Sequence, residues 1–516
     1  MPDEDHHTPS LCARCGQPLA RKGSLCAACG AGEGPPAKPA EPSPAVPSAV
    51  AGIESPLREL IRIAAPSVAT MTSYTAMQFI DGLMVSRITP ADPVYISAQG
   101  NGGMAAWIPV SVVMGLLMIV NTFVSQNFGA GKPERGSGYA WNAFWTCVAC
   151  ALAIMPLVFV LPWIFGRMDH DERLLELETE YATIMILGSV TTMGSRGVAQ
   201  FFYGLHRPGT VLVAALTGNA VNILLNYMLI FGKFGAPELG VSGAAIATVT
   251  GAGVELAIQF AVFLSPRFNA KYKTRSAWRP SLPHMRDIIR VGWPGALMFA
   301  SEMVCWGYFM VVMVGEFGTI EQTAGWITLR FMHLSFMPAV GVSIAVSAMV
   351  GKCIGMGRKD LAEARAWLGL RVTLVYMGAC ALGFLGFREE MVRLFIKDGT
   401  PPEDVEALVR TGSRVLIAAA VFQLFDAAAI TMSAALRGAG DTIWPGVLAL
   451  ILSWGTIVAG GHALMHWMPE LKSLGPWIAA SSYIILLGII LLWRFMRGSW
   501  RNIDLLARSE GSVAQG

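Results

Sequence analysis

Charged residues are scarce in this sequence of 516 residues. Asp, Glu, Lys and Arg make up only 14% of it and 54% is hydrophobic, whereas a soluble protein usually carries about 25% charged residues. So few charges cannot cover a water-soluble globule of this length, and we therefore expect a membrane protein. The formal net charge is only +3, which gives no reason to expect a nucleic-acid partner.

Other signatures are also missing. Residues 1–7 are polar and acidic rather than basic and then apolar, so we expect no cleaved signal peptide and an uncleaved first helix near Leu60. The apolar runs are continuous rather than alternating, which excludes a porin-like barrel. Residues 129–132 (Gly-Ala-Gly-Lys) lack the Lys-Ser/Thr ending of a phosphate loop, and no nucleophile–base set accompanies them. We therefore expect no enzyme.

Twelve apolar stretches are present, each close to or above the roughly 17–25 residues that a transmembrane helix needs. We place them at 60–85, 104–123, 141–165, 181–202, 211–231, 241–264, 288–314, 323–350, 367–387, 415–436, 444–465 and 477–493. In this arrangement basic loops fall on one side and acidic loops on the other. The positive-inside rule then predicts a multi-pass protein of the inner (plasma) membrane with both termini in the cytoplasm.

The membrane part repeats itself. A Gly-x-Gly-basic segment at Gly129 returns 226 positions later at Gly355, and Arg62 to Pro66 returns as Arg290 to Pro294 at an offset of 228. A duplicated membrane chain is typical of transporters whose substrate path lies between two halves. We expect an N-lobe over residues 55–265, a C-lobe over 266–500 and a cytoplasmic tail over 501–516.

A small cysteine module precedes the membrane part. Cys12 and Cys15 form one Cys-x-x-Cys-Gly knuckle, and Cys26 and Cys29 form a second. Two such pairs can close a structural four-thiolate Zn²⁺ site, so residues 1–30 are predicted to be a zinc ribbon. The alternative, a pair of disulfides, is disfavoured in the cytoplasm. Residues 31–52 are Pro/Ala-rich and are predicted to be an extended linker.

Three carboxylates lie well inside apolar stretches: Asp81, Glu302 and Asp426. A charge at the membrane centre costs about 2.5–3.5 kcal/mol on insertion scales, so such residues favour a functional interpretation. The alternative is a neutral carboxylate, or one paired with an arginine, that only packs helices. Glu255 is a fourth candidate, but nothing in its sequence surroundings converges on it, and a helix-pairing role is equally open.

A polar stripe runs along the stretch 211–231. Asn219, Asn222 and Asn226 recur at three and four residues, which places them on one face of a helix. Such a stripe can line a cavity, coordinate a cation or bond a neighbouring helix.

The motifs together resemble the multidrug and toxic compound extrusion (MATE) transporters over about residues 55–500. The matching segments are Pro66 with Asp81-x-x-Met84-Val85, Ser125 to Gly131, Asn222 to Gly232, Gly240 to Thr248, and Leu436 to Thr442. The resemblance implies an all-α membrane protein of twelve helices in two pseudo-symmetric six-helix lobes. It also implies efflux of small organic cations or drugs, driven by H⁺ or Na⁺ through alternating access.

The resemblance also assigns roles to residues. Asp81 matches an acidic ion-coupling position of the first helix, and Asn222 matches its partner on the fifth. Asn226 stands where the DinF-type branch has a second acid, whereas Glu302 and Asp426 match acids of the NorM-type branch, so the chain is similar to NorM. The predicted ion-coupling and substrate residues are Asp81, Asn222, Asn226, Thr248, Glu302 and Asp426.

Two alternatives remain open at the level of the sequence. One is a lipid or lipid-linked oligosaccharide flippase of the same superfamily, although carboxylates rather than cations favour cationic substrates. The other is a zinc-responsive membrane sensor or scaffold, against which the repeat and the buried acids argue. We expect a monomer in the lipid bilayer, whose ribbon could contact a cytoplasmic partner. The substrate, the choice between H⁺ and Na⁺, and the role of the ribbon stay open.

Overall fold

The computed structural model describes residues 55–90, 92, 94–168, 171–396 and 401–507. The chain separates into two units, Met1–Ser55 and Pro56–Gly516, and the description below concerns the second. The predicted zinc ribbon (1–30) and linker (31–52) lie outside the described residues.

All regular elements in the described ranges are helical. Those before residue 273 are α1 (Pro56–Val85), α2 (Val94–Leu117), α3 (Ile119–Gly129), α4 (Pro133–Ile154), α5 (Leu157–Phe165), α6 (Glu172–Leu187), α7 (Ser189–Gly204), α8 (Pro208–Phe231), α9 (Gly240–Phe263) and α10 (Pro266–Tyr272). Those after it are α11 (Leu282–Tyr308), α12 (Thr319–Gly355), α13 (Lys359–Gly386), α14 (Arg388–Arg393), α15 (Pro402–Ala439), α16 (Ile443–Leu452), α17 (Gly461–Trp467) and α18 (Leu474–Met496). Two π-helical segments, Phe309–Val314 and Ser453–Gly460, extend α11 and join α16 to α17.

Nine helical segments in the described part of the chain are long and apolar enough to cross a membrane, or ten if α4 and α5, bent by 47°, form one span. Two of the twelve predicted spans are absent even from the larger set of ten. The stretch 60–85 lies within α1, which is long enough but less apolar, because polar side chains such as Gln78 and Asp81 interrupt its hydrophobic residues. The stretch 181–202 is divided at Gly188 between α6 and α7, each of 16 residues. A multi-pass, all-helical protein is therefore confirmed, whereas the number twelve stays a prediction.

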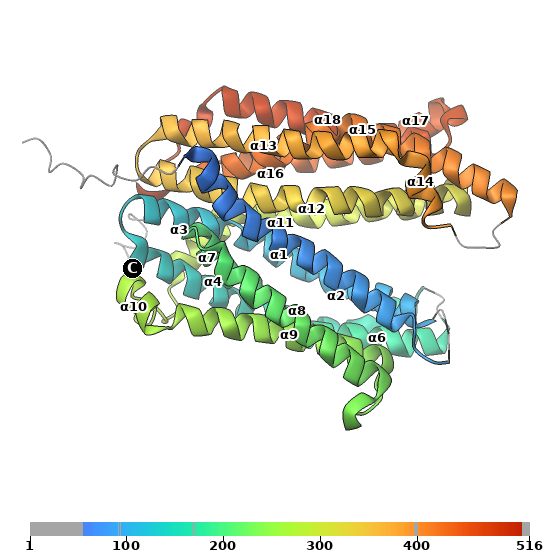
Figure 1. Cartoon of the computed structure of the whole chain (residues 1–516), viewed down its shortest axis with the longest axis horizontal. Helices are drawn as coiled ribbons and strands as arrows, with labels where there is room; N and C mark the ends of the chain where they lie inside the picture. Colours follow the sequence, from blue (N-terminus) through green and yellow to red (C-terminus); the bar gives the residue numbers. More distant parts are fainter. Residues whose placement is uncertain (1–54, 91, 93, 169–170, 397–400, 508–516) are drawn as a thin grey trace, which may run out of the picture. The chain divides into compact units, whose positions relative to one another are not determined.

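The two copies of the repeat supply two groups of helices, which we call the first half (α1–α10) and the second half (α11–α18). Figure 1 shows α8 and α9 in green on the opposite side from α15 and α18 in orange and red, with α1 and α12 between them. Within the second half α15 packs on α12, α13 and α18, and within the first half α8 packs on α9 and α4 on α7. The halves meet where α1 and α3 contact α12, and where α2 contacts α11.

The repeated Gly-x-Gly segments lie at this junction. A Cβ added to Gly129 of α3 would lie 2.0 Å from the carbonyl oxygen of Lys352, and one added to Gly355 of α12 would lie 1.9 Å from that of Gln126. Only glycine permits such an approach. Because Lys352 follows Gln126 by the same 226 positions, the two helix ends cross as partners of the repeat.

The second glycine of each segment ends its helix. Gly131 follows α3 with φ +74°, and Gly357 follows α12 with φ +72°. Both are left-handed conformations that favour glycine and commonly stop a helix. In each Gly-x-Gly segment, the first glycine therefore allows close contact between the halves, and the second lets the chain turn towards the next helix.

Candidate functional sites

The first candidate site surrounds Asp81, near the end of α1. The carboxylate is only 6% exposed, and Asn226 of α8 donates from Nδ2 to Asp81 Oδ1 at 2.5 Å. The same Asn226 amide group lies 3.3 Å from Asn222 Oδ1. The structure thus brings together an acid and an amide stripe that are more than 140 positions apart in the sequence.

The network continues to α9. Asn222 Nδ2 donates to Thr248 Oγ1 at 3.3 Å, so four of the predicted residues, Asp81, Asn222, Asn226 and Thr248, form one chain of contacts. Asn219, one turn further along α8, instead donates to Ser73 of α1 at 3.2 Å. The buried Oδ1 of Asn226 accepts no hydrogen bond from any residue that the structure describes, which leaves an oxygen acceptor beside the acid for a proton donor or a cation.

The second candidate site lies among α11, α15 and α18. Tyr483 of α18 donates its hydroxyl to Glu302 Oε1 at 3.2 Å. Asp426 of α15 is half-buried and within electrostatic range of Glu302. The structure therefore groups Glu302 and Asp426, as the resemblance implies, and adds Tyr483 to them.

A third carboxylate, Glu255, has a similar environment in the first half. It is 4% exposed and accepts hydrogen bonds from Tyr74 at 2.7 Å and from Gln259 at 3.1 Å. Arg196 lies over the Tyr74 ring at 3.4 Å. The hydrogen-bond partners of Glu255 come from α1 and from its own helix α9. The choice between a functional and a helix-pairing role for Glu255 stays open.

The repeat relates this third site to the second. Tyr74 and Glu302 occupy positions 228 apart, and so do Glu255 and Tyr483. Each half therefore carries one tyrosine–carboxylate pair between its first and last long helices, with the two residue types exchanged, although Glu302 is only half-buried. The offset of 228 found between Pro66 and Pro294 was the signal that could have identified both tyrosines.

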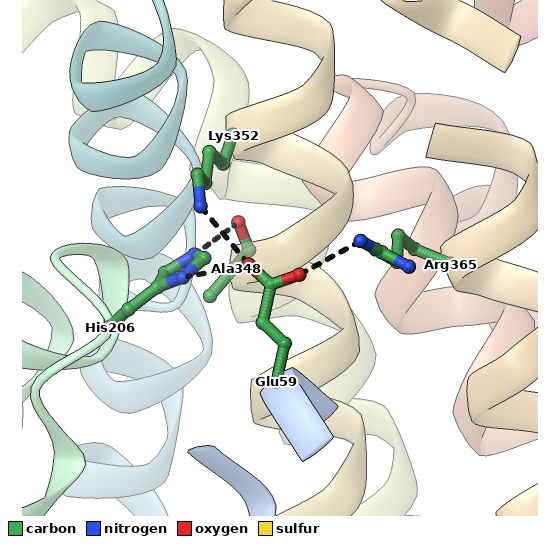
Figure 2. Close-up of polar contacts among 5 residues, drawn as sticks. All are labelled: Glu59, His206, Ala348, Lys352 and Arg365. Atoms are coloured by element: carbon green, nitrogen blue, oxygen red, sulfur yellow. Dashed lines mark hydrogen bonds and ion pairs between the residues drawn. The ribbon is translucent and has the colours of Figure 1, made fainter. Parts of the chain in front are cut away.

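Sequence reasoning also missed an ionic cluster where the halves meet. Figure 2 shows Glu59 of α1 between Lys352 of α12 and Arg365 of α13. Glu59 Oε1 lies 3.0 Å from Lys352 Nζ, and Glu59 Oε2 lies 3.0 Å from Arg365 Nη2. The Glu59 side chain is 13% exposed. We call Glu59, Lys352 and Arg365 the latch, because these contacts join the first half to the second.

His206, in the turn between α7 and α8, is the neighbour of the latch. One ring nitrogen lies 3.1 Å from the Ala348 carbonyl oxygen and the other 3.8 Å from Glu59 Oε1. Burial, helped by the positive charge of Lys352, lowers the pKa of His206 to about 4, although Glu59 acts in the opposite direction. The imidazole is therefore neutral near pH 7, and the latch holds one carboxylate against two cations.

A cavity of about 620 Å³ extends along α1. It is lined by small and apolar side chains from one face of that helix, namely Ile61, Ala64, Ala65, Val68, Ala69, Thr72, Ser73 and Ala76. It is widely open, because every residue that lines it belongs to α1. Ser73 also bonds Asn219, so the cavity wall is in contact with the polar stripe of α8, whereas Asp81 itself does not line it.

Comparison with known proteins decides the family. The family model described as MatE matches residues 66–228 and, a second time, residues 294–459. The chain belongs to the MatE family. The two matches begin at Pro66 and Pro294, the pair that marks the repeat, so each half of this MatE protein is one copy of the family's unit.

Relatives of this MatE protein are named multidrug resistance proteins. It is 28% identical over 471 residues to the probable multidrug resistance protein NorM of Thermotoga maritima, covering 87% of this chain and 94% of that protein. It is 26% identical over 437 residues to the multidrug resistance protein MdtK of Yersinia pestis, covering 82% and 91%. The predicted resemblance to NorM-type members of the family is thereby confirmed.

Solved structures share the fold of this MatE protein. A MOP superfamily transporter from Pyrococcus furiosus matches with a TM-score of 0.77 at 19% identity, over 87% of this chain and 97% of that one. An outward-facing multidrug resistance MATE family transporter matches with the same score at 20% identity, over 87% and 97%. At such identities the likeness concerns the fold alone.

Proposed function

We propose that this MatE protein is a secondary transporter that exports small organic cations or drugs in exchange for H⁺ or Na⁺. The observation that carries the proposal is the buried Asp81 carboxylate, held at 2.5 Å by the neutral amide of Asn226. Such an acid can hold a proton, a Na⁺ ion or the positive group of a substrate, but not all of them at once. Competition for the same oxygens then couples the two fluxes.

Glu302, which accepts a hydrogen bond from Tyr483, and Asp426 provide a second acidic site in the other half. The membrane potential adds about 2.3 kcal/mol per charge per 100 mV to whichever ion moves inward. Loading either acid changes the charge buried among packed helices, and this change favours one arrangement of the halves over the other.

The transport pathway would open and close where the two halves meet. The latch ties α1 to α12 and α13, on the basic side that the positive-inside rule assigns to the cytoplasm. A closed latch corresponds to a pathway shut on that side, and its opening admits substrate. Crossing by α1 and by α6 with α7, added to the ten apolar segments, would complete twelve spans and leave both termini in the cytoplasm.

Export of a fluorescent cation from proteoliposomes tests the proposal, with inward H⁺ and Na⁺ gradients imposed separately. We expect one gradient to drive export by wild type, and Asp81→Asn to lose that dependence because it keeps the shape but not the charge. Asp426→Asn and Glu302→Gln test the second pair, and Asp360→Asn, at an exposed acid, is the matched control. Folded wild type that exports nothing under either gradient would contradict the proposal and favour a lipid flippase.

We keep the zinc ribbon as a separate proposal for Cys12, Cys15, Cys26 and Cys29. Two Cys-x-x-Cys-Gly knuckles support it, because four thiolates form a closed structural site. Metal analysis of the full chain should find Zn²⁺ that is lost in a variant with serine at Cys12 and Cys15. Metal-free protein purified without chelators would overturn it. Because four thiolates fill the site, export should not depend on this metal.

A further inference from the structure

A second cavity, of about 590 Å³, opens beside the latch and has the opposite character to the cavity along α1. It is bounded by α1, the end of α3, the turn between α7 and α8, α10 and the end of α12. Its charged and titratable lining is basic and consists of Arg62, His206, Arg207, Lys271 and Lys352. No Asp or Glu is among the twelve residues that line it.

Two of the cations of this cavity contact aromatic rings rather than carboxylates within the described ranges. Arg207 lies over the Phe268 ring at 5.7 Å and Lys271 over the Tyr272 ring at 5.4 Å. Among the described residues, neither Arg207 nor Lys271 forms an ion pair with a carboxylate. Lys352 donates to Glu59 at 3.0 Å, so its charge is shared with the latch, and His206 is neutral near pH 7 because its pKa is about 4.

The backbone adds to the positive electrostatic potential of this cavity. Pro208, Gly209 and Thr210, the first residues of the 24-residue helix α8, line the cavity. Pro208 has no amide hydrogen, and the Thr210 amide donates to the Arg207 carbonyl oxygen at 3.3 Å. The start of α8 therefore offers the Gly209 amide together with the positive end of the helix dipole. A Cβ added to Gly209 would meet no other atom within 4 Å, so the start of α8 is accessible from the cavity.

We propose that this cavity binds a phosphate group, carried by the head group of an anionic phospholipid or by a free phosphate ion. Clustered Arg and Lys side chains with a helix start are the recognised chemistry of phosphate binding, and basic pockets between transmembrane helices suit anionic head groups. The same charges repel organic cations, so the site is distinct from a route for the proposed substrates.

Arg207 and Lys271 are the positions for the test, because Lys352 also serves the latch. The double variant Arg207→Gln/Lys271→Gln removes two cavity charges. Its control, Arg267→Gln/Lys273→Gln, removes two exposed charges on or next to α10 that do not line the cavity. The purified full chain is placed in nanodiscs of neutral phosphatidylcholine, and thermal unfolding is followed during titration with inorganic phosphate, against chloride at matched ionic strength.

Phosphate should stabilise wild type and the control variant, and its apparent affinity for the cavity variant should be weaker by about tenfold or more. A second arm uses phosphate-free buffer and nanodiscs with added phosphatidylglycerol. Stabilisation there identifies a lipid head group as the source, and stabilisation by inorganic phosphate alone identifies the free ion.

Two results would overturn the proposal: no stabilisation beyond that by chloride in either arm, or an equal response of the cavity and control variants. If the double variant does not fold, the single change Lys271→Gln, at an exposed side chain, carries the same comparison with Arg267→Gln.

Discussion

At the scale of single residues, the buried acids are of two kinds. Asp81 and Glu302 are held by neutral donors, an amide and a phenol, and no ion pair to either is found within the described ranges. Glu59 is instead held by two cations. An acid with neutral partners can gain or lose a charge without breaking an ion pair, whereas Glu59 cannot. The first kind suits ion exchange, and the second suits a structural contact.

The two tyrosine–carboxylate pairs predict unequal effects of removing a hydroxyl. Tyr74→Phe leaves Glu255 with its bond from Gln259, whereas Tyr483→Phe removes the one hydrogen bond that Glu302 accepts within the described part of the chain. A buried group that loses its partner costs about 1–3 kcal/mol, so Tyr483→Phe should lower stability and ion-driven export more. Thermal unfolding and efflux in proteoliposomes measure both, and a larger loss in Tyr74→Phe would contradict this reading.

His206 predicts a pH effect at the latch. Its pKa is about 4 in the folded protein and near 6.5 when exposed, so the unfolded chain takes up the proton first. The free energy of unfolding that His206 contributes is therefore present above about pH 6.5. It is lost progressively as the pH falls towards 4. Wild type should lose more stability on acidification than His206→Gln, and parallel pH profiles would show that the ring is not buried as described.

At the scale of helices, the Gly-x-Gly segments set how closely α3 and α12 approach. Gly355→Ala would place a methyl group 1.9 Å from the Gln126 carbonyl oxygen, so the helices must separate, at a cost of about 1–3 kcal/mol as in other overpacked cores. Gly383→Ala, in α13, meets nothing within 4 Å and should be neutral or slightly stabilising. Comparable unfolding temperatures for the two variants would show that the close crossing does not matter.

Hydropathy and the repeat could predict most elements, but not how they contact one another. The divided stretch 181–202 shows the limit. At Gly188 an added Cβ would meet the Val249 side chain at 2.3 Å, so the break between α6 and α7 coincides with a contact to α9 that hydropathy does not register. The latch escaped prediction because Glu59 and Lys352 are 293 positions apart. The partnership of Glu255 with a tyrosine could have been predicted, because the offset of 228 relates Glu255 to Tyr483.

At the scale of the whole membrane unit, the proposed change of access would have to break the latch, because its ion pairs join the two halves. Glu59→Gln leaves Lys352 and Arg365 without their carboxylate. Removing one partner of a fully buried ion pair costs about 3–5 kcal/mol, and the cost here should be smaller because the Lys352 side chain is 29% exposed. We expect the halves to separate at this end. Spin labels at Lys132 and Arg358, which follow the two Gly-x-Gly segments, should then report longer and broader distances than in wild type.

The control for that experiment is Asp360→Asn. Asp360 pairs with Arg358 at the surface, where both side chains are more than half exposed, and such pairs are worth about 0–1 kcal/mol. With the second label moved to Lys359, the distances in this variant should match those of wild type. Unchanged distances in Glu59→Gln would remove the latch from the account of alternating access.

The central claim is that substrate and ion move in opposite directions through one pair of halves. The most direct test runs the cycle backwards. Proteoliposomes receive a gradient of an organic cation and no ion gradient, and the internal pH or Na⁺ is recorded with a trapped dye. The account predicts ion movement against the flow of the organic cation, lost in Asp81→Asn. Equilibration of the organic cation without any ion movement would contradict exchange and leave a uniporter or a flippase.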